Sequence, residues 1–132
     1  MKQEFSRRQI NAPDAPQTTH RRYAQGIEIS NGNRTLYISG QIPVETDGAR
    51  PTEFKGQARL AWRNVERQLA AAGMSLDNLV KVTVFLAGYE YRDENAEIRF
   101  EVMGERMVAL STVIVGPYDP DWLIEIEAIA VA

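Results

Sequence analysis

Two runs rich in β-branched and aromatic residues stand out in the first third of the chain, 23–30 (YAQGIEIS) and 34–43 (RTLYISGQIP). An Asn-Gly-Asn segment at 31–33 separates them. Asn-Gly is a strong hairpin signal because both residues tolerate positive φ. We therefore expect the two runs to pair as a β-hairpin. A short strand at 3–10 and a Pro-containing loop precede it.

A repeat of three to four residues follows and predicts a long amphipathic helix. Thr52 is the expected N-cap, Glu53 suits the positive end of the helix dipole, and Gly73 is the expected stop. Apolar residues at this spacing share one helical face, so we expect this face to cover a sheet. These residues are Phe54, Ala58, Ala61, Trp62, Val65, Leu69 and Ala72.

The second half of the chain predicts three more strands and one more helix. The β-branched run at 79–88 (LVKVTVFLAG) is typical of a central strand. Acidic residues after Asp93 open a second helix that runs toward Gly104. Two final strands, 108–115 and 122–131, are joined by the turn-rich segment GPYDPD.

The order of these elements predicts one α+β domain spanning residues 1–132. The simplest architecture is a two-layer sandwich, in which two helices lie on one face of a six-stranded mixed sheet. Nothing in a chain of this length remains to cover the other face of the sheet. We therefore expect a homo-oligomer in which these sheet faces pack together.

The residue composition excludes several kinds of catalytic and binding site. The chain has 132 residues and no Cys, which excludes disulfides and thiol nucleophiles and favours a cytoplasmic location. A single histidine, His20, excludes a multi-histidine metal centre within one chain. The net charge of -3 argues against nucleic acid, and no run of about 18 apolar residues predicts a membrane span.

Four basic residues are spaced along the first predicted helix. At helical spacing such a stripe is usually the solvated face of an amphipathic helix, and we interpret it so. The residues are Lys55, Arg59, Arg63 and Arg67.

Three segments together resemble one family. The strand ending LYISGQIPV, the stretch AAAGMSLDNLVKVTVFLA and the final strand IEIEAIAV are similar, in order and spacing, to the reactive intermediate deaminase family, RidA/YjgF. Segments 11–13 (NAP) and 23–26 (YAQG) extend the resemblance over nearly the whole chain. It implies a chorismate-mutase-like fold and a homotrimer that binds a small molecule in clefts between subunits. It implies no metal or organic cofactor.

The resemblance also assigns roles to individual residues. Tyr23 would line the cleft, Ser39 and Gly40 would contact the ligand, and Glu125 would orient or activate water. Each has a structural alternative. Tyr23 is equally consistent with a half-buried strand residue, the Ser-Gly pair with a strand end or bulge, and Glu125 with an arginine partner.

One departure from the family pattern concerns the substrate anchor. Family deaminases carry an arginine suited to gripping the substrate carboxylate, and this position falls at Val108. Arg106, two residues earlier, would reach the cleft rim if the strand extends that far, and Arg22 is a further candidate. The family's helix asparagine falls at Ala96, next to Asn95.

The resemblance favours an enzyme, because characterised members hydrolyse 2-aminoacrylate-type enamines and their imine tautomers to 2-keto acids and ammonia. An imine carbon is already electrophilic, so positioning, a polarised water and charge stabilisation suffice without a strong nucleophile. The substrate here need not be a 2-imino acid. A non-catalytic trimer that binds a small metabolite is the alternative, and an endoribonuclease or translation inhibitor is the third candidate.

Overall fold

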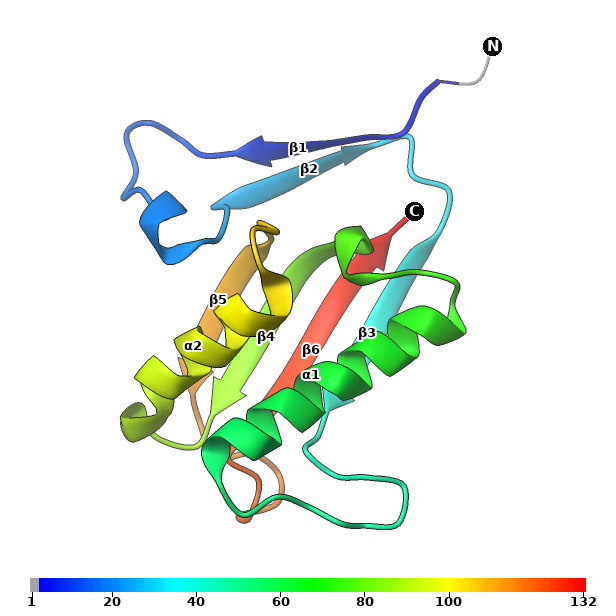
Figure 1. Ribbon diagram of the computed structural model, residues 1–132. Coiled ribbons are helices and arrows are strands. Elements are labelled where there is room, and N and C mark those ends of the chain that lie inside the picture. The colour runs from blue at the N-terminus through cyan, green and yellow to red at the C-terminus, as the bar shows by residue number, and fades with distance from the viewer. Residues whose placement is uncertain (1–2) are drawn as a thin grey trace.

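The computed structural model describes residues 3–132 and builds its main layer from four strands in the order β3-β6-β4-β5 (Figure 1). β6 is antiparallel to both β3 and β4, whereas β4 and β5 are parallel, so the sheet is mixed. The four strands are β3 (Thr35–Gln41), β4 (Leu79–Leu86), β5 (Ala109–Ile114) and β6 (Ile124–Val131).

Both helices, α1 (Phe54–Ala71) and α2 (Arg92–Met103), cover the same face of this sheet (Figure 1). The two-layer α+β architecture predicted from the sequence is therefore confirmed. Short 3₁₀ turns occupy Thr19–Arg21, Leu76–Asn78 and Tyr89–Tyr91. No helix within residues 3–132 has the length and apolar character that crossing a membrane requires.

Helix α1 forms almost where the sequence predicts. Its N-cap is Glu53 rather than Thr52, and no side chain caps it. At the other end Gly73 adopts φ +70, and the N–H of Met74 donates to the carbonyl of Leu69. A left-handed residue is what such a helix ending requires, which is why glycine stands at the predicted stop.

The core lies between α1, α2 and the helix-facing side of the sheet. Side chains alternate along a strand, and on β6 every second residue from Ile124 to Ala130 is buried beneath the helices. The predicted apolar face of α1 supplies the other half, with Trp62 and Leu69 almost completely buried. β4 is an interior strand, as predicted, because it pairs on both edges.

The predicted hairpin between 23–30 and 34–43 is wrong. β2 (Gly26–Ser30) pairs with β1 (Ser6–Ile10), while β3 pairs with β6. After Asn31, the N–H groups of Asn33 and Arg34 both donate to the carbonyl of Ala132, which carries the chain onto β6. Gly32 serves this close approach rather than a tight turn, because a Cβ there would lie 2.6 Å from Val131 Cγ1.

The predicted six-stranded sheet also needs correction. β1 and β2 form a separate two-stranded sheet that runs across one end of the main sheet (Figure 1). Just before β2, Ala24 forms one parallel bridge with Ala109 at the start of β5. Arg7 holds β1 across this end, because its guanidinium donates to the carbonyl oxygens of Leu79 and Met107. Side-chain bonds of this kind leave no periodic trace in a sequence.

Replacing Arg7 with Ala should loosen this two-stranded sheet. The change leaves two partly buried carbonyls without their donors, so we expect a loss of about 1–3 kcal/mol in the free energy of unfolding. Urea denaturation followed by circular dichroism measures the loss. Faster hydrogen exchange of the β1 and β2 amides should accompany it.

Arg8 provides the matched control, because it neighbours Arg7 on β1 but is exposed and pairs with Glu28 at 3.0 Å. An exposed ion pair contributes little, so Arg8→Ala should cost no more than about 0.5 kcal/mol. Equal losses for the two variants would contradict the anchoring role of Arg7.

Candidate functional site

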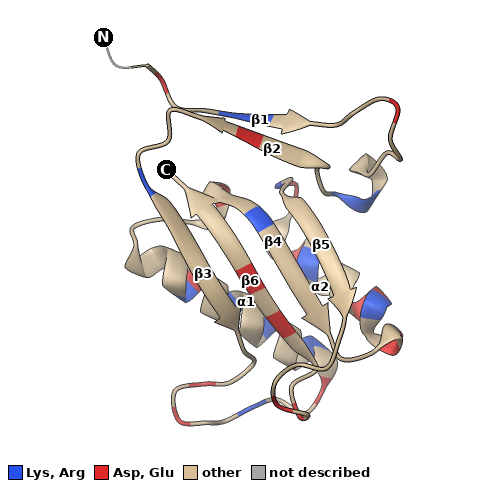
Figure 2. Ribbon diagram, turned by 180° about the vertical axis from the view of Figure 1, so that it is seen from behind, with Lys and Arg blue, Asp and Glu red and all other residues tan. Residues whose placement is uncertain are grey.

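The face of the main sheet that the helices leave uncovered carries a row of polar side chains. Figure 2 views this face and shows two acidic positions on β6 and a basic position on the neighbouring strand β4. Glu127 pairs across the sheet with Thr83, and Glu125 with Phe85, so all four side chains share this open face. A cavity of about 290 Å³ lies here, lined among others by Tyr37, Ser39, Lys81, Thr83 and Glu127.

Ser39 and Gly40 lie at an irregularity in β3. The register between β3 and β6 shifts between Ile38 and Gln41, so the Ser-Gly pair occupies a bulge, as the structural interpretation of this pair predicted. The bulge does not exclude a functional role, because bulges are common beside active sites, where they redirect side chains. Ser39 is exposed and lines the open-face cavity.

Gly40 makes room for the carboxylate of Glu125. A Cβ at position 40 would lie 2.8 Å from Glu125 Cδ, closer than side chains normally approach. Burial raises the pKa of Glu125, and the nearby charge of Glu127 raises it further. The structure therefore brings together three of the predicted site residues and gives one of them, Glu125, an altered proton affinity.

Tyr23 lies elsewhere in the protomer. It lines a second cavity of about 690 Å³, bounded by α2, the 3₁₀ turn before β2 and the helix-facing side of β5. Ser39 and Glu125 point to the opposite face of the sheet. A single chain therefore does not unite all the predicted residues in one cleft.

Val108 and Arg106 line neither of these cavities. Val108 is 2% exposed, belongs to the core, and its carbonyl accepts the N–H of Ala24 at 2.9 Å. Arg106 Nε donates to Asp77 Oδ1 at 2.7 Å, and β5 begins only at Ala109. The extended strand that would have carried Arg106 to the cleft rim is absent.

Arg99 is not among the residues predicted from the sequence, although it lines the second cavity. Its side chain is 6% exposed, and its Nη atoms donate to the carbonyls of Arg21 and Arg22 at 2.9 and 3.1 Å. The guanidinium lies 5.9 Å from the ring of Tyr23. Burial lowers its pKa, an effect that Tyr23 opposes and Arg22 reinforces. The only signal in the sequence is an arginine one residue from Ile98 on the buried side of α2.

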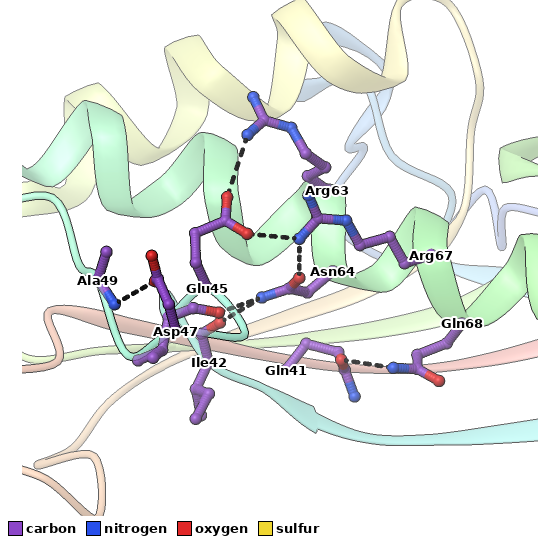
Figure 3. Close-up of polar contacts among 10 residues, drawn as sticks. Gln41, Ile42, Glu45, Asp47, Ala49, Arg63, Asn64, Arg67 and Gln68 are labelled. Carbon is purple, nitrogen blue, oxygen red and sulfur yellow. Dashed lines mark hydrogen bonds and ion pairs between the residues drawn. The ribbon is translucent and has the colours of Figure 1, made fainter.

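The basic stripe of α1 is neutralised within the chain. Lys55 pairs with Glu97 and Arg59 with Glu101, which joins α1 to α2. The other two cations share one partner, because Glu45 lies between Arg63 and Arg67, as Figure 3 shows. These exposed pairs agree with the interpretation of the stripe as a solvated helix face.

Within residues 3–132, no group of three or more His, Asp or Glu side chains is arranged to hold a metal ion.

Comparisons with known proteins show to which protein family the chain belongs. The sequence model of the family described as Endoribonuclease L-PSP matches residues 12–132. RutC family protein PH0854 of Pyrococcus horikoshii is 38% identical over 110 residues, which cover 82% of this chain and 85% of the relative. The 2-iminobutanoate/2-iminopropanoate deaminase of Escherichia coli is 37% identical over 113 residues, covering 83% and 86%.

A solved structure shows the same fold. The Rid family protein YyfB of Yersinia pestis superposes with a TM-score of 0.84 over 96% of this chain and 98% of its own, at 23% identity. This protein is therefore a small two-layer α+β protein of the Rid class. The chain belongs to the RidA/YjgF family.

The raised pKa of Glu125 predicts a pH-dependent cost in stability. A carboxyl group that binds its proton more tightly when folded stabilises the folded protein fully below its ordinary pKa, and this stabilisation is lost as pH rises through the folded pKa. Glu125→Gln removes the titration. The free energy of unfolding of the variant, relative to that of the wild type, should therefore be higher at about pH 7.5 than at about pH 4. Urea denaturation at the two pH values measures this difference.

Glu66→Gln, an exposed change on α1, is the control and should leave the pH dependence unaltered. A difference between wild type and Glu125→Gln that stays constant with pH would contradict the raised pKa.

Proposed function

We propose that this protein is a hydrolytic deaminase, which converts a small imine or its enamine tautomer to a carbonyl compound and ammonia. The observation that carries the proposal is Glu125, a carboxylate with a raised pKa that is seated against the Gly40 bulge on an open sheet face. Family membership supports it, as does the name of the Escherichia coli relative, 2-iminobutanoate/2-iminopropanoate deaminase.

The reaction asks for proton transfer more than for a nucleophile. Water adds its oxygen to the imine carbon while the nitrogen gains a proton, which gives a carbinolamine. The hydroxyl proton then moves to nitrogen, the C–N bond breaks, and the products are a C=O group and ammonia. One water is consumed. No redox step occurs.

Glu125 suits both proton transfers. As a carboxylate it accepts a proton from the attacking water, and as a carboxylic acid it returns the proton to the departing nitrogen. A general acid and base works best when its pKa lies near the working pH, and the burial of Glu125 moves its pKa in that direction. The hydroxyl of Ser39 and the backbone at Gly40 supply the polar contacts beside it.

Assembly would complete the site. We place the ligand cleft between subunits of a homotrimer, where Ser39, Gly40 and Glu125 of one subunit face the Tyr23 cavity of the next. The open sheet face supports this, because Tyr37 on it is 75% exposed and Val113 41% exposed. Exposed apolar side chains on an uncovered sheet favour association. The small-molecule ligand would then contact two chains.

The other candidate functions receive less support. The α1 cations, the basic stripe that an RNA would contact, are all within 3.7 Å of carboxylates of the same chain, so their charge is neutralised. A metabolite-binding protein without catalysis would keep the cleft and lack turnover. Activity measurements separate it from the enzyme.

Glu125→Gln should abolish most of the turnover. Imines are generated in the assay from amino acids by an amino-acid oxidase or dehydratase, and keto acid formation is followed with and without the protein. Loss of a positioned general acid and base lowers kcat by about 10²–10⁴-fold. Glu66→Gln on α1 should leave kcat unchanged. If the wild type accelerates no imine, the result contradicts the deaminase and favours the metabolite-binding alternative.

Gly40→Ala tests the placement of Glu125 independently. The added methyl group would meet the end of a flexible side chain, so the fold should survive while the carboxylate moves. We expect a loss of kcat approaching that of Glu125→Gln, with an unchanged circular dichroism spectrum. Gly116→Ala is the matched control, since a Cβ there meets nothing within 4 Å. Full activity of Gly40→Ala would contradict the role of this contact.

A further inference from the structure

Positive charge gathers around the larger cavity, the one beside α2. Its lining includes the side chains of Arg21, Arg92 and Arg99, against a single carboxylate, Asp93. The whole chain carries a net charge of -3, so this concentration runs against the overall balance. A cavity with one dominant sign of charge attracts ligands of the opposite sign.

In the part of the chain that the structure describes, the arginines of this cavity have no acidic partner, as is also true of Arg22 and Arg34, whereas six other arginines have one. Arg59, Arg63 and Arg67 on α1 all pair with carboxylates, as do Arg8, Arg50 and Arg106. Within residues 3–132, Arg21, Arg92 and Arg99 form no ion pair with Asp or Glu. Arg92 donates instead to the carbonyl of Tyr89, and Arg99 to two loop carbonyls. Their charges stay available to an anion in the cavity.

Two distinct cationic centres result from the spacing along α2. Arg92, Asn95 and Arg99 line the same cavity because residues three, four and seven apart share a helical face. Arg92 and Arg99 are seven residues apart, which is about 10 Å along the helix axis. Arg99 is buried and forms a deep centre, whereas Arg92 and Arg21 are exposed and supply two further cations at the rim.

The deep centre holds two polar atoms that have no hydrogen-bond partner among residues 3–132. Asn95 and Arg99 are each 6% exposed, yet Asn95 Oδ1 and Arg99 Nε have no hydrogen-bond partner in the described part of the chain. A buried polar atom without a partner is costly, and a ligand that pairs with it recovers that cost. One free acceptor beside one free donor matches the head of an imino acid, which offers an N–H and an adjacent carboxylate.

We propose that this cavity selects a dicarboxylic imino acid, whose first carboxylate faces Arg99 and whose second faces Arg92 and Arg21. The imine N–H is directed to Asn95 Oδ1. The cation thus comes from α2 rather than from position 108, where Val108 is buried in the core. The identity of the ligand as an imine rests on the proposed function, whereas its two negative charges rest on the arginines. A cavity of about 690 Å³ accommodates a five-carbon dicarboxylate.

Titration calorimetry with stable keto acids tests the charge preference directly. 2-Oxoglutarate carries both carboxylates, and 2-oxohexanoate has a similar length with only one. We expect the wild type to bind 2-oxoglutarate about tenfold more tightly, the effect of one charge-assisted hydrogen bond. Arg92→Gln and Arg21→Gln should each remove most of this preference and leave the affinity for 2-oxohexanoate within about twofold.

These rim variants avoid the structural role of Arg99, which holds the carbonyls of residues 21 and 22. Arg63→Gln is the matched control, an exposed arginine whose partner Glu45 keeps Arg67, and it should change neither affinity. Equal binding of the two keto acids would overturn the proposal. So would inorganic phosphate that binds as tightly as 2-oxoglutarate with the same dependence on Arg92 and Arg21, because that result defines a general anion site.

Kinetics separate this proposal from the proposed function. An oxidase acting on glutamate supplies the dicarboxylic imine, and one acting on norleucine supplies its monocarboxylic counterpart. If the protein accelerates both equally and Arg92→Gln has no effect, the dicarboxylate assignment fails and the deaminase stands. If 2-oxoglutarate binds with the expected arginine dependence and no imine is hydrolysed, the deaminase fails and the dicarboxylate site stands.

Discussion

The structure depends on β6, which pairs on both edges and divides its side chains strictly between two environments. Every second residue from Ile124 to Ala130 is buried beneath the helices, while Glu125 and Glu127 between them face outward. Two carboxylates on one open face repel each other, and Gly40 on the neighbouring strand brings Glu125 into partial burial. The alternation that builds the core therefore also creates the acid–base group of the proposed site.

Arginine is used in two ways in this protein. On α1 the arginines pair with carboxylates at the surface, where ion pairs contribute little to stability and mainly keep the helix face soluble. Around the cavity beside α2 they pair with backbone carbonyls or aromatic rings and keep their charge unneutralised. The difference lies in the surroundings rather than in the residue type, because carboxylates that would neutralise these arginines are largely missing from that cavity.

Within a single chain, the residues of the proposed site lie on two opposite faces of the main sheet. Tyr23 and the arginines lie on the helix side of the sheet near β5, and Ser39, Gly40 and Glu125 lie on the open side near β3. A cleft formed between neighbouring copies would reunite them, with the cationic half recognising the substrate and the acidic half moving protons. In such an arrangement oligomerisation and catalysis have the same structural origin, the uncovered face of the sheet.

Local patterns in the sequence determined much of the fold. The three- to four-residue repeat predicted the buried face of α1, Gly73 its end, and the β-branched runs the interior position of β4 and the two final strands. The order of the predicted elements indicated the two-layer architecture, and the motif resemblance predicted the family. These features depend on residues close together in the chain, where side-chain spacing and backbone preference act directly.

Tertiary structure alone decided the strand partners and the charged half of the site. The Asn-Gly-Asn segment favoured a hairpin between β2 and β3. Instead, the N–H groups of Asn33 and Arg34 donate to the carbonyl of Ala132, about a hundred residues away in the chain, and β2 pairs with β1. Arg99 became a candidate only once its burial beside Tyr23 was visible. The physical reason is the same in both cases: a hydrogen bond or a buried charge is decided by which groups meet in space, and periodicity along a chain records only which side each residue faces.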